Sequence, residues 1–575
     1  MEREASRVFL YNRPMRSPIS RRQFLETAGL AAGAGLVLRG CATGKDFDIV
    51  LKGGLVYDGL GGPPLEADIG LVGSRIKEVG RISAGRGRAV LDIRSRAVSP
   101  GFIDIHDHTD AQLLVNPTAD SASRQGVTVL VSGQCGSSPV PIAASELEER
   151  TNLLRREYGL ELSWRDLPSF FARLEERGMG LNYGTLIGHG SVRGAAMGFE
   201  DRAPRPEEQA KMESFVAEAL AAGALGLSSG LEYTPGSFAR PDELVALCRV
   251  VARSGGVYAT HIRDEGDKLL ESLDESISVA REAGVKLQIS HFKTAYPRNW
   301  SKVESAIARV EGAKAAGVDI FCDRYPYIAG STSLSFNFPL WAREGTTDEF
   351  LAKLKDPRRE AELRSALRER EAKLGSWDKV VISSVLSEKN RVYEGLDVLE
   401  ASRRAGQQPF EFMRDLVVEE RDNVDMVIFM MSEDNLRRIL AHPLVGVGAD
   451  ASVRSPSGPL GRGKPHPRAY GTFARALGRY ARDEKVVPME EMIKKMTSRP
   501  AAHFGLVERG AVQPGFYADL VVFDPAQIID RATWKEPHQF PSGVEHVFVN
   551  GVSVVEGGAA TGRLPGQILR RAGSA

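Results

Sequence analysis

The sequence carries no net charge, since its 575 residues include 75 basic and 75 acidic side chains. This balance argues against a partner held by bulk electrostatics, such as a nucleic acid or an anionic membrane surface. After its N-terminal segment the chain also lacks a long apolar run, so no transmembrane helix is expected in its body. Neither an internal repeat nor a low-complexity tract is visible. These absences leave a globular chain long enough for one large catalytic domain and smaller additional ones.

Cysteine is scarce, with four residues in the whole chain, and no disulfide framework is expected. Cys248 lies in a helical pattern and Cys322 ends an apolar strand, so both are predicted to be buried core thiols. Cys135 differs, because nearby glycines permit a tight turn that aims its sulfur inward. A thiolate in such a position is a strong zinc ligand.

Residues 1–44 are interpreted as a targeting segment and not as part of the fold. They contain the twin-arginine pattern Ser20-Arg21-Arg22-Gln23-Phe24-Leu25, followed by an Ala- and Gly-rich run over 28–38. Leu38-Arg39-Gly40-Cys41 then resembles a lipoprotein cleavage box, with Arg39 as an unusual occupant. We expect export by the twin-arginine route to the periplasm or cell envelope, with lipid attachment at Cys41 as a further hypothesis. The alternative is a disordered basic leader, and membrane contact is expected only through this segment or its lipid.

Short apolar runs alternate with amphipathic helical patterns between residues 101 and 330. The runs predicted as strands are 127–132, 181–187, 224–228, 257–261, 286–291 and 318–323. The predicted helices are 206–222, 241–254, 269–283 and 300–316. This alternation indicates a parallel sheet. Polar residues gather at the carboxyl ends of its strands, where a (β/α)₈ barrel keeps its active site.

The predicted fold is an α/β chain with a (β/α)₈ barrel over 99–505 and a small β-sandwich domain built from both chain ends. The two sandwich segments are 45–98 and 506–575, which are rich in strand and turn patterns. Residues 340–440 break the alternation with a charged, helix-rich pattern. We interpret them as an insertion that covers the barrel mouth.

The strongest local signal for a metal is the stretch Phe102-Ile103-Asp104-Ile105-His106-Asp107-His108. Side chains alternate across a strand, so His106 and His108 leave it on one face and Asp107 points away. Two neighbouring imidazoles form half of a divalent metal site. His261 and His291 end two further predicted strands, and the ends of parallel strands converge at a barrel mouth. Histidines at equivalent strand ends are hard to explain as ordinary core or surface residues.

Asp450 ends the last predicted barrel strand, over 445–450, and precedes a glycine- and serine-rich loop. A carboxylate at this position can accept the proton of a metal-bound water. The alternative is a turn residue or a helix N-cap. The expected convergence with the histidines favours catalysis.

These residues together resemble the amidohydrolase superfamily, and most closely its D-aminoacylase (N-acyl-D-amino-acid deacylase) family. The resemblance extends over nearly all of residues 45–560. It is carried by the segments 100–108, 133–136, 188–190, 258–263, 290–293, 323–327 and 466–468. Two general marks of the superfamily are Ser498-Arg499-Pro500-Ala501-Ala502 and Gly515-Phe516-Tyr517-Ala518-Asp519-Leu520.

The resemblance implies zinc as the cofactor, with a cysteine thiolate between two metal positions. One tight zinc corresponds to the ligands Cys135, His261 and His291. A second, more weakly occupied position is bordered by His106, His108 and Asp450.

The resemblance also implies a substrate site beside the metals. Residues of the family around the scissile acyl group correspond to Lys293, Tyr325 and Ser331, and Tyr233 corresponds to a pocket residue. Arg468 corresponds to the residue that pairs with the substrate carboxylate, where a planar guanidinium suits bidentate binding.

The implied reaction is zinc-dependent hydrolysis of an N-acyl-D-amino acid to a carboxylic acid and a free D-amino acid. Asp450 is expected to transfer the proton, and Tyr325 or Lys293 to stabilise the oxyanion. The expected partner is thus a small N-acyl amino acid and not a nucleic acid. Two alternatives stay open. One is another amidohydrolase, either a cyclic amidase or an unusual dipeptidase. The other is a non-catalytic metal- or solute-binding lipoprotein, which would not need Asp450 and Lys293 together.

The sequence departs from the family pattern near the expected site. Asp107 stands where threonine is more common, and Gln134 replaces a common asparagine. Ala449-Asp450-Ala451 replaces a common Ser-Asp-Gly. These changes leave the expected ligands intact. The segment between Asp450 and Arg468 is longer than the family pattern, so the preferred substrate side chain stays open.

Overall fold

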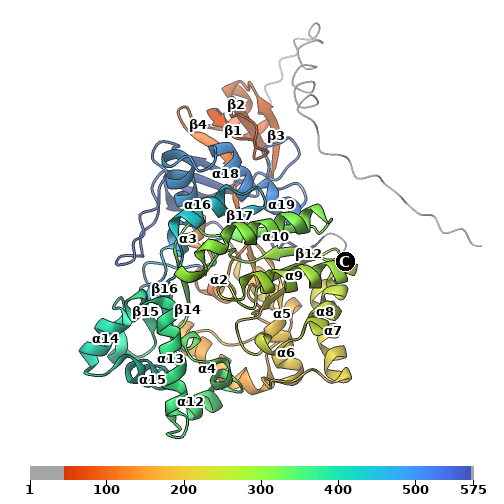
Figure 1. Ribbon diagram of the computed structural model, residues 1–575. Helices are drawn as coiled ribbons and strands as arrows, with labels where there is room; N and C mark the ends of the chain where they lie inside the picture. The colour runs from red at the N-terminus through yellow and green to blue at the C-terminus, as the bar shows by residue number, and fades with distance from the viewer. Residues whose placement is uncertain (1–44, 572–575) are drawn as a thin grey trace, which may run out of the picture.

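Short parallel strands between residues 102 and 447 form the barrel of the computed structural model, which describes residues 45–571 (Figure 1). The first three strands pair in the order β6 (Phe102–Asp104), β7 (Val127–Ser132) and β8 (Asn182–Thr185). A second sheet continues in the order β9 (Ile187–Gly188), β10 (Gly226–Gly230), β11 (Val257–His261), β12 (Lys286–Ile289), β13 (Ile320–Arg324) and β17 (Val445–Val447). The predicted targeting segment, with its twin arginines and Cys41, lies outside the described residues.

The barrel closes where the chain after β17 meets the chain after β6. The Asp450 N–H donates to the His106 carbonyl at 2.7 Å, and Asp107 forms a parallel bridge with Ala451. Every residue of β7, β10, β11 and β13 is buried, as expected for parallel strands covered on both faces. The predicted (β/α)₈ fold is confirmed. The predicted strand over 181–187 is divided at Leu186 into β8 and β9.

Helices follow the barrel strands in the predicted alternation. They are α5 (Leu167–Arg177), α6 (His189–Met197), α7 (Pro206–Ala221), α8 (Pro241–Arg253), α9 (Leu269–Ala283), α10 (Val303–Ala315) and α16 (Glu433–Ala441). In α9 the buried residues include Leu269, Leu273 and Ala280, which lie on one apolar stripe. α10 begins at Val303 and not at residue 300, because a 3₁₀ turn over Pro297–Lys302 precedes it.

Further helices lie outside this alternation, some early in the barrel segment and some after its last strand. Three of them lie between β6 and α5 in the chain: α2 (Gln112–Val115), α3 (Asp120–Ser123) and α4 (Leu147–Tyr158). Those after the last strand are α17 (Arg468–Arg475), α18 (Met489–Met496) and α19 (Ser498–Phe504). Residues Ala476–Asp483 continue α17 as a π-helical segment.

The insertion has a sheet of its own (Figure 1). Its buried apolar side chains form a core cluster separate from that of the barrel. Its strands β14 (Ala329–Ser333), β16 (Val424–Phe429) and β15 (Val380–Val385) pair antiparallel in that order. Its helices are α11 (Leu340–Arg343), α12 (Thr347–Lys355), α13 (Glu360–Leu374), α14 (Val398–Ala405) and α15 (Pro409–Glu419). The charged pattern of 340–440 predicts these helices but not the sheet, whose first strand lies before residue 340. α16 falls within that range but packs against the barrel strand β17.

Strands from both chain ends form one mixed sheet, with nine strands among the described residues. The N-terminal strands are β1 (Phe47–Val56), β2 (Leu65–Val72), β3 (Arg75–Gly80), β4 (Gly87–Asp92) and β5 (Ala97–Pro100). The C-terminal strands are β18 (Leu520–Phe523), β19 (Val544–Val549), β20 (Val552–Glu556) and β21 (Ala559–Ala560). The antiparallel pair β5 and β18 joins the two groups. The predicted β-domain built from both chain ends is confirmed.

The C-terminal tail leaves this sheet and returns to the barrel. Pro565 and Ile568 form parallel bridges with Met179 and Tyr183. Part of the segment predicted to complete the sandwich therefore lies along β8 instead. Among the described residues, no helix combines the length and the apolar composition that crossing a membrane requires.

Candidate active site

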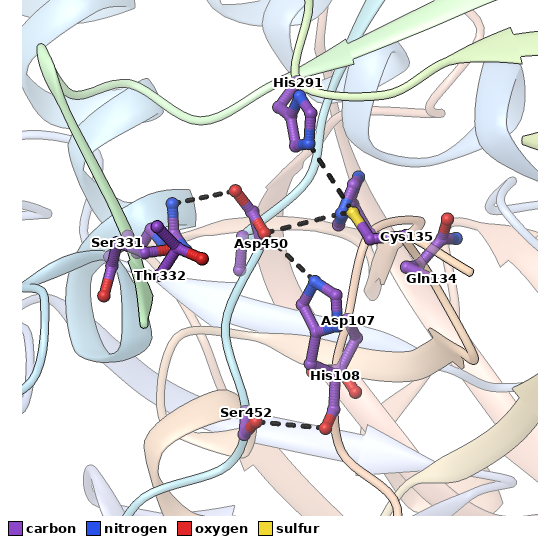
Figure 2. A network of polar contacts seen from close by, with 12 residues as sticks. Asp107, His108, Gln134, Cys135, His291, Ser331, Thr332, Asp450 and Ser452 are labelled. Carbon is purple, nitrogen blue, oxygen red and sulfur yellow. Dashed lines mark hydrogen bonds and ion pairs between the residues drawn. The ribbon is translucent and has the colours of Figure 1, made fainter. Parts of the chain in front are cut away.

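Side chains from several strand ends meet at the carboxyl end of the barrel (Figure 2). His106 and His108 follow β6, Cys135 follows β7, and the others are His261 at the end of β11, His291 after β12 and Asp450 after β17. Their ligand atoms form three overlapping groups, each within 4.8 Å: His106, His108 and Cys135; Cys135, His261 and His291; and His106, His291 and Asp450. The structure thus brings together all six residues that the sequence suggests as metal ligands.

Cys135 lies where these groups overlap. Its Sγ is 3.3 Å from Nε2 of His106 and 3.6 Å from Nε2 of His291. Asp450 Oδ1 lies 3.1 Å from Nε2 of His108 and 3.5 Å from Nε2 of His106. Figure 2 shows the Asp450 carboxylate facing His108 and the Cys135 side of the site. One thiolate can therefore serve two neighbouring metal positions.

Three of these residues adopt a backbone conformation that residues with a Cβ rarely take. The φ angle is 51° at Cys135, 37° at His291 and 53° at Asp450. Left-handed conformations cost energy in such residues, and they gather at functional sites. Gly133 permits the turn before Cys135, because a Cβ there would lie 2.1 Å from the carbonyl oxygen of Leu186. The sulfur is aimed into the barrel mouth at the expense of local backbone strain.

The charges around Cys135 favour its thiolate form. Burial alone would raise the pKa of the thiol, but the imidazole of His106 and a hydrogen bond with His108 hold the pKa well below its usual value. A thiolate with the imidazoles of His261 and His291 is a three-ligand set that suits zinc and leaves one coordination position open. The donor set therefore fits the expected metal.

Two buried carboxylates lie behind the ligand histidines. Asp323 Oδ1 is 3.0 Å from Nδ1 of His106, and Glu265 Oε1 is 2.8 Å from Nδ1 of His291. A carboxylate at Nδ1 fixes the tautomer that presents Nε2 to a metal. Lys293, expected near the scissile acyl group, contacts the Glu265 carboxylate, and its Nζ lies 2.8 Å from Nδ1 of His291. The Lys293 side chain therefore lines the cavity and at the same time contacts the Glu265 carboxylate.

Arg468 connects Asp450 to the expected substrate residues. Its Nη1 lies 2.8 Å from Asp450 Oδ2, and its Nη2 donates to the Ser331 carbonyl at 3.4 Å. The guanidinium also lies over the Tyr325 ring, 4.6 Å from its centroid. Burial would raise the pKa of Asp450, but Arg468 and His106 hold it well below its usual value.

The loop after β10 brings two further side chains to the ligands. The Tyr233 ring lies 4.8 Å from the His261 ring, and the Thr332 hydroxyl donates to the Tyr233 hydroxyl at 3.3 Å. Glu232 Oε2 lies 3.2 Å from Nε2 of His261. The buried Nδ1 of His261 has no hydrogen-bond partner among the described residues, so it is the nitrogen left for a metal, and Glu232 supports the ring from Nε2.

One cavity of about 520 Å³ connects the ligands with the expected substrate residues. Its wall includes all five of the latter: Tyr233, Lys293, Tyr325, Ser331 and Arg468. The insertion contributes Phe336, Ile428 and Met430 to the same wall. A volume of this size is typical of small-molecule sites.

Three carboxylates of the site are not singled out by the sequence. Asp323 ends the predicted strand 318–323 and is the last residue but one of β13, so the strand-end rule that selects the histidines could also have found it. Glu265 and Glu232 lie in loops, where no side-chain periodicity indicates which way a carboxylate points. Their contacts depend on how the loops fold over the strand ends.

Comparisons with known proteins agree with this geometry. The Amidohydrolase family matches residues 389–555. An N-acyl-D-glutamate deacylase of Alcaligenes xylosoxydans xylosoxydans is 36% identical over 530 residues, which cover 92% of this chain and 97% of the relative. A crystal structure of N-acyl-D-glutamate deacylase from Bordetella bronchiseptica holds zinc and a phosphonate that mimics the tetrahedral intermediate. It is 32% identical, with a TM-score of 0.77, and covers 92% of this chain and 100% of its own.

A D-aminoacylase structure is equally similar, with 35% identity, a TM-score of 0.77 and coverage of 91% of this chain and 100% of its own. That protein is described as having a binuclear metal centre, with activation by one metal and attenuation by a second. Both similarities extend through the barrel and the terminal sheet.

Proposed function

Since this chain belongs to the D-aminoacylase (N-acyl-D-amino-acid deacylase) family of amidohydrolases and hydrolyses the amide bond of N-acyl-D-amino acids, we propose that the reaction uses one tightly held zinc on Cys135, His261 and His291. The observation that carries the proposal is the convergence of these three ligand atoms within 4.8 Å at the wall of the substrate cavity. The zinc held by a relative of similar fold supports the choice of metal.

The residues of the chain have separate tasks in this mechanism. When bound, zinc polarises the scissile carbonyl and lowers the pKa of water to about 7. Arg468 binds the α-carboxylate of the substrate, and Asp450 takes a proton from the attacking water and delivers it to the departing amine. Tyr325 supplies a hydrogen bond to the developing oxyanion, while Lys293 is shared with Glu265. The products are a carboxylic acid and a free D-amino acid.

We further propose that the second metal position, on His106, His108 and Asp450, is the weaker one. Asp450 already lies 2.8 Å from the Arg468 guanidinium, so a second cation would compete for the same carboxylate. A metal at this position would also bind Asp450, the residue that transfers the proton. We therefore expect a second metal to slow the reaction.

For the location, we propose export by the twin-arginine route, with Cys41 as the lipid-bearing residue that anchors the enzyme in the cell envelope. The proposal rests on the pattern around Arg21 and Arg22. Replacement of both arginines by lysine should leave the folded protein in the cytoplasm. Continued export of that variant would contradict the assignment.

A panel of N-acetyl-D-amino acids, N-acetyl-L-amino acids and hydantoins tests the proposed function, with release of free amine or acid as the readout. We expect hydrolysis of the D-compounds. Asp450→Ala should keep zinc while kcat falls by roughly 10²–10⁴-fold. Ring opening of hydantoins without deacylation would indicate a cyclic amidase. A zinc-loaded protein that turns over none of the panel would indicate a binding protein.

A further inference from the structure

The buried hydroxyl of Ser228 holds the backbone on both sides of Cys135. Its Oγ donates to the Gly133 carbonyl at 2.5 Å and accepts from the Gly136 N–H at 3.0 Å. Ser228 lies in the middle of β10 and is fully buried. One side chain of β10 therefore fixes the segment after β7 that presents the sulfur.

The turn around Cys135 is one that a residue with a Cβ rarely occupies. The Ser137 N–H donates to the Gln134 carbonyl at 3.1 Å, so Cys135 and Gly136 are the two central residues of the turn. Their φ angles are 51° and 78°. Turns with positive φ at both central positions favour glycine, asparagine and aspartate. A cysteine keeps such a conformation only where the surrounding structure fixes it.

Two other contacts reach the same turn, and each holds one side of it. The Ser191 N–H donates to the Gly136 carbonyl at 3.2 Å, and Nε2 of Gln134 donates to the Ile105 carbonyl at 2.7 Å. Neither holds both sides of the cysteine, as the Ser228 hydroxyl does.

β10 also fits the turn closely through its backbone. A Cβ at Gly230 would lie 2.1 Å from the Cys135 carbonyl oxygen, so glycine is needed for this approach. Without the Ser228 hydroxyl, the Gly133 carbonyl and the Gly136 N–H would lose this partner. Both glycines are buried, and a buried backbone group without a partner is costly. We expect the turn to relax toward a negative φ at Cys135, which would move the sulfur.

We propose that Ser228 is a positioning residue, which fixes the backbone around Cys135 so that its thiolate faces both metal positions. This inference rests on the proposed metal site, in which Cys135 supplies the sulfur ligand. The Cys135 Sγ lies 3.3 Å from Nε2 of His106 and 3.6 Å from Nε2 of His291, so a shift of the turn changes its distance from both imidazoles. Loss of the Ser228 hydroxyl should therefore weaken the metal–sulfur bond before it affects the imidazole ligands.

Cobalt substitution tests the proposal. A thiolate bound to Co²⁺ gives a charge-transfer absorption band in the near ultraviolet, which imidazole and carboxylate ligands do not give. Wild type should show this band, and Cys135→Ala should lack it. In Ser228→Ala the band per bound cobalt should weaken. The zinc affinity of this variant, measured by competition with a chelator, should fall roughly 10–100-fold.

The next residue of β10 provides the matched control. Ser229 is equally buried and points to the opposite face of the strand, where its Oγ lies 2.8 Å from the hydroxyl oxygens of Tyr258 and Thr260. Ser229→Ala removes a buried hydroxyl from the same strand without touching the turn. It should keep the wild-type cobalt band and zinc affinity.

Three results would overturn the proposal. The first is an unchanged band and zinc affinity in Ser228→Ala. The second is an equal loss in Ser229→Ala, which would make the effect a general one of removing a buried hydroxyl. The third is weaker zinc binding in Ser228→Ala with a full band per bound cobalt, because Ser228 would then not act through the sulfur.

The same measurements separate this proposal from the proposed function. Neither readout needs a substrate, so a protein that fails to deacylate N-acyl-D-amino acids leaves the test of Ser228 valid. Absence of the band in wild type would instead remove Cys135 from the metal site, and the role of Ser228 with it.

Discussion

Arg468 Nη1 lies 2.8 Å from Asp450 Oδ2, and the two residues are only 5% and 8% exposed. The expected anchor of the substrate carboxylate is therefore in direct contact with the expected proton carrier. One guanidinium can position the substrate and keep the carboxylate ionised. A change at Arg468 should consequently disturb both binding and proton transfer.

Removal of Arg468 should abolish the preference for substrates with a free α-carboxylate. A charge-assisted hydrogen bond contributes about 1.5–3 kcal/mol, so wild-type enzyme should hydrolyse N-acyl-D-amino acids roughly 10–100-fold faster than the matching amides. In Arg468→Ala the kcat/KM values for acid and amide should become similar. Arg462→Ala, at an exposed arginine of the same loop, is the matched control. Equal discrimination in wild type and Arg468→Ala would rule out Arg468 as the anchor.

The same variant should change the pH dependence of the reaction. Burial raises the pKa of Asp450, and Arg468 is the largest influence that lowers it. Without the guanidinium the pKa rises, so the ionised base is lost at a higher pH on acidification. The acid limb of the kcat/KM profile should move to higher pH in Arg468→Ala, and less so in Arg468→Lys. An acid limb that stays in place would mean that another group titrates there.

Glu265→Gln should weaken zinc binding without removing a ligand. The carboxylate 2.8 Å from Nδ1 of His291 holds the tautomer that exposes Nε2, and loss of such a partner typically lowers metal affinity by roughly 10–100-fold. Competition with a chelator measures the change. Glu271→Gln, at an exposed residue of α9, should keep the wild-type affinity. If both variants hold zinc equally well, Glu265 does not orient the histidine.

Lys495 is not one of the residues that line the active-site cavity, and it should make the stability of the folded protein depend on pH. It is 1% exposed, and its Nζ donates to the Val445 carbonyl at 2.8 Å. Burial, with a smaller contribution from Arg499, lowers the pKa of Lys495 from 10.5 to about 7. At pH values between about 7 and 10.5 the unfolded chain binds the Lys495 proton more strongly than the folded chain. The free energy of unfolding therefore rises with pH in this range, by up to about 1.4 kcal/mol per pH unit.

Lys495→Met removes this proton linkage. The variant should gain thermal stability relative to wild type at pH 7, and the difference should shrink as the pH approaches 10. Thermal midpoints of the two proteins across this range provide the test. A difference that does not change with pH would show that Lys495 titrates alike in the folded and unfolded chain.

The residues differ in how far their roles can be predicted from the sequence. The barrel and the positions of His261 and Cys135 follow from local patterns, because strand periodicity and strand ends are encoded in neighbouring residues. The sheet of the insertion is not predicted, because β14 and β16 pair across nearly a hundred residues of chain. The contacts of Glu265 and Glu232 depend on loop conformation, and the left-handed φ of Cys135, His291 and Asp450 is imposed by tertiary structure.

Zinc content of two cysteine variants tests the central claim most directly. Cys135 lies among the ligand histidines, whereas Cys248 is a fully buried thiol of α8 whose pKa is raised by burial. Metal analysis after purification and dialysis should find about one zinc per chain in wild type and in Cys248→Ala, as expected for a catalytic site with three protein ligands and one open position. Cys135→Ala should contain almost none and should be inactive on N-acyl-D-amino acids. Full zinc retention in Cys135→Ala would contradict the assignment of the metal site.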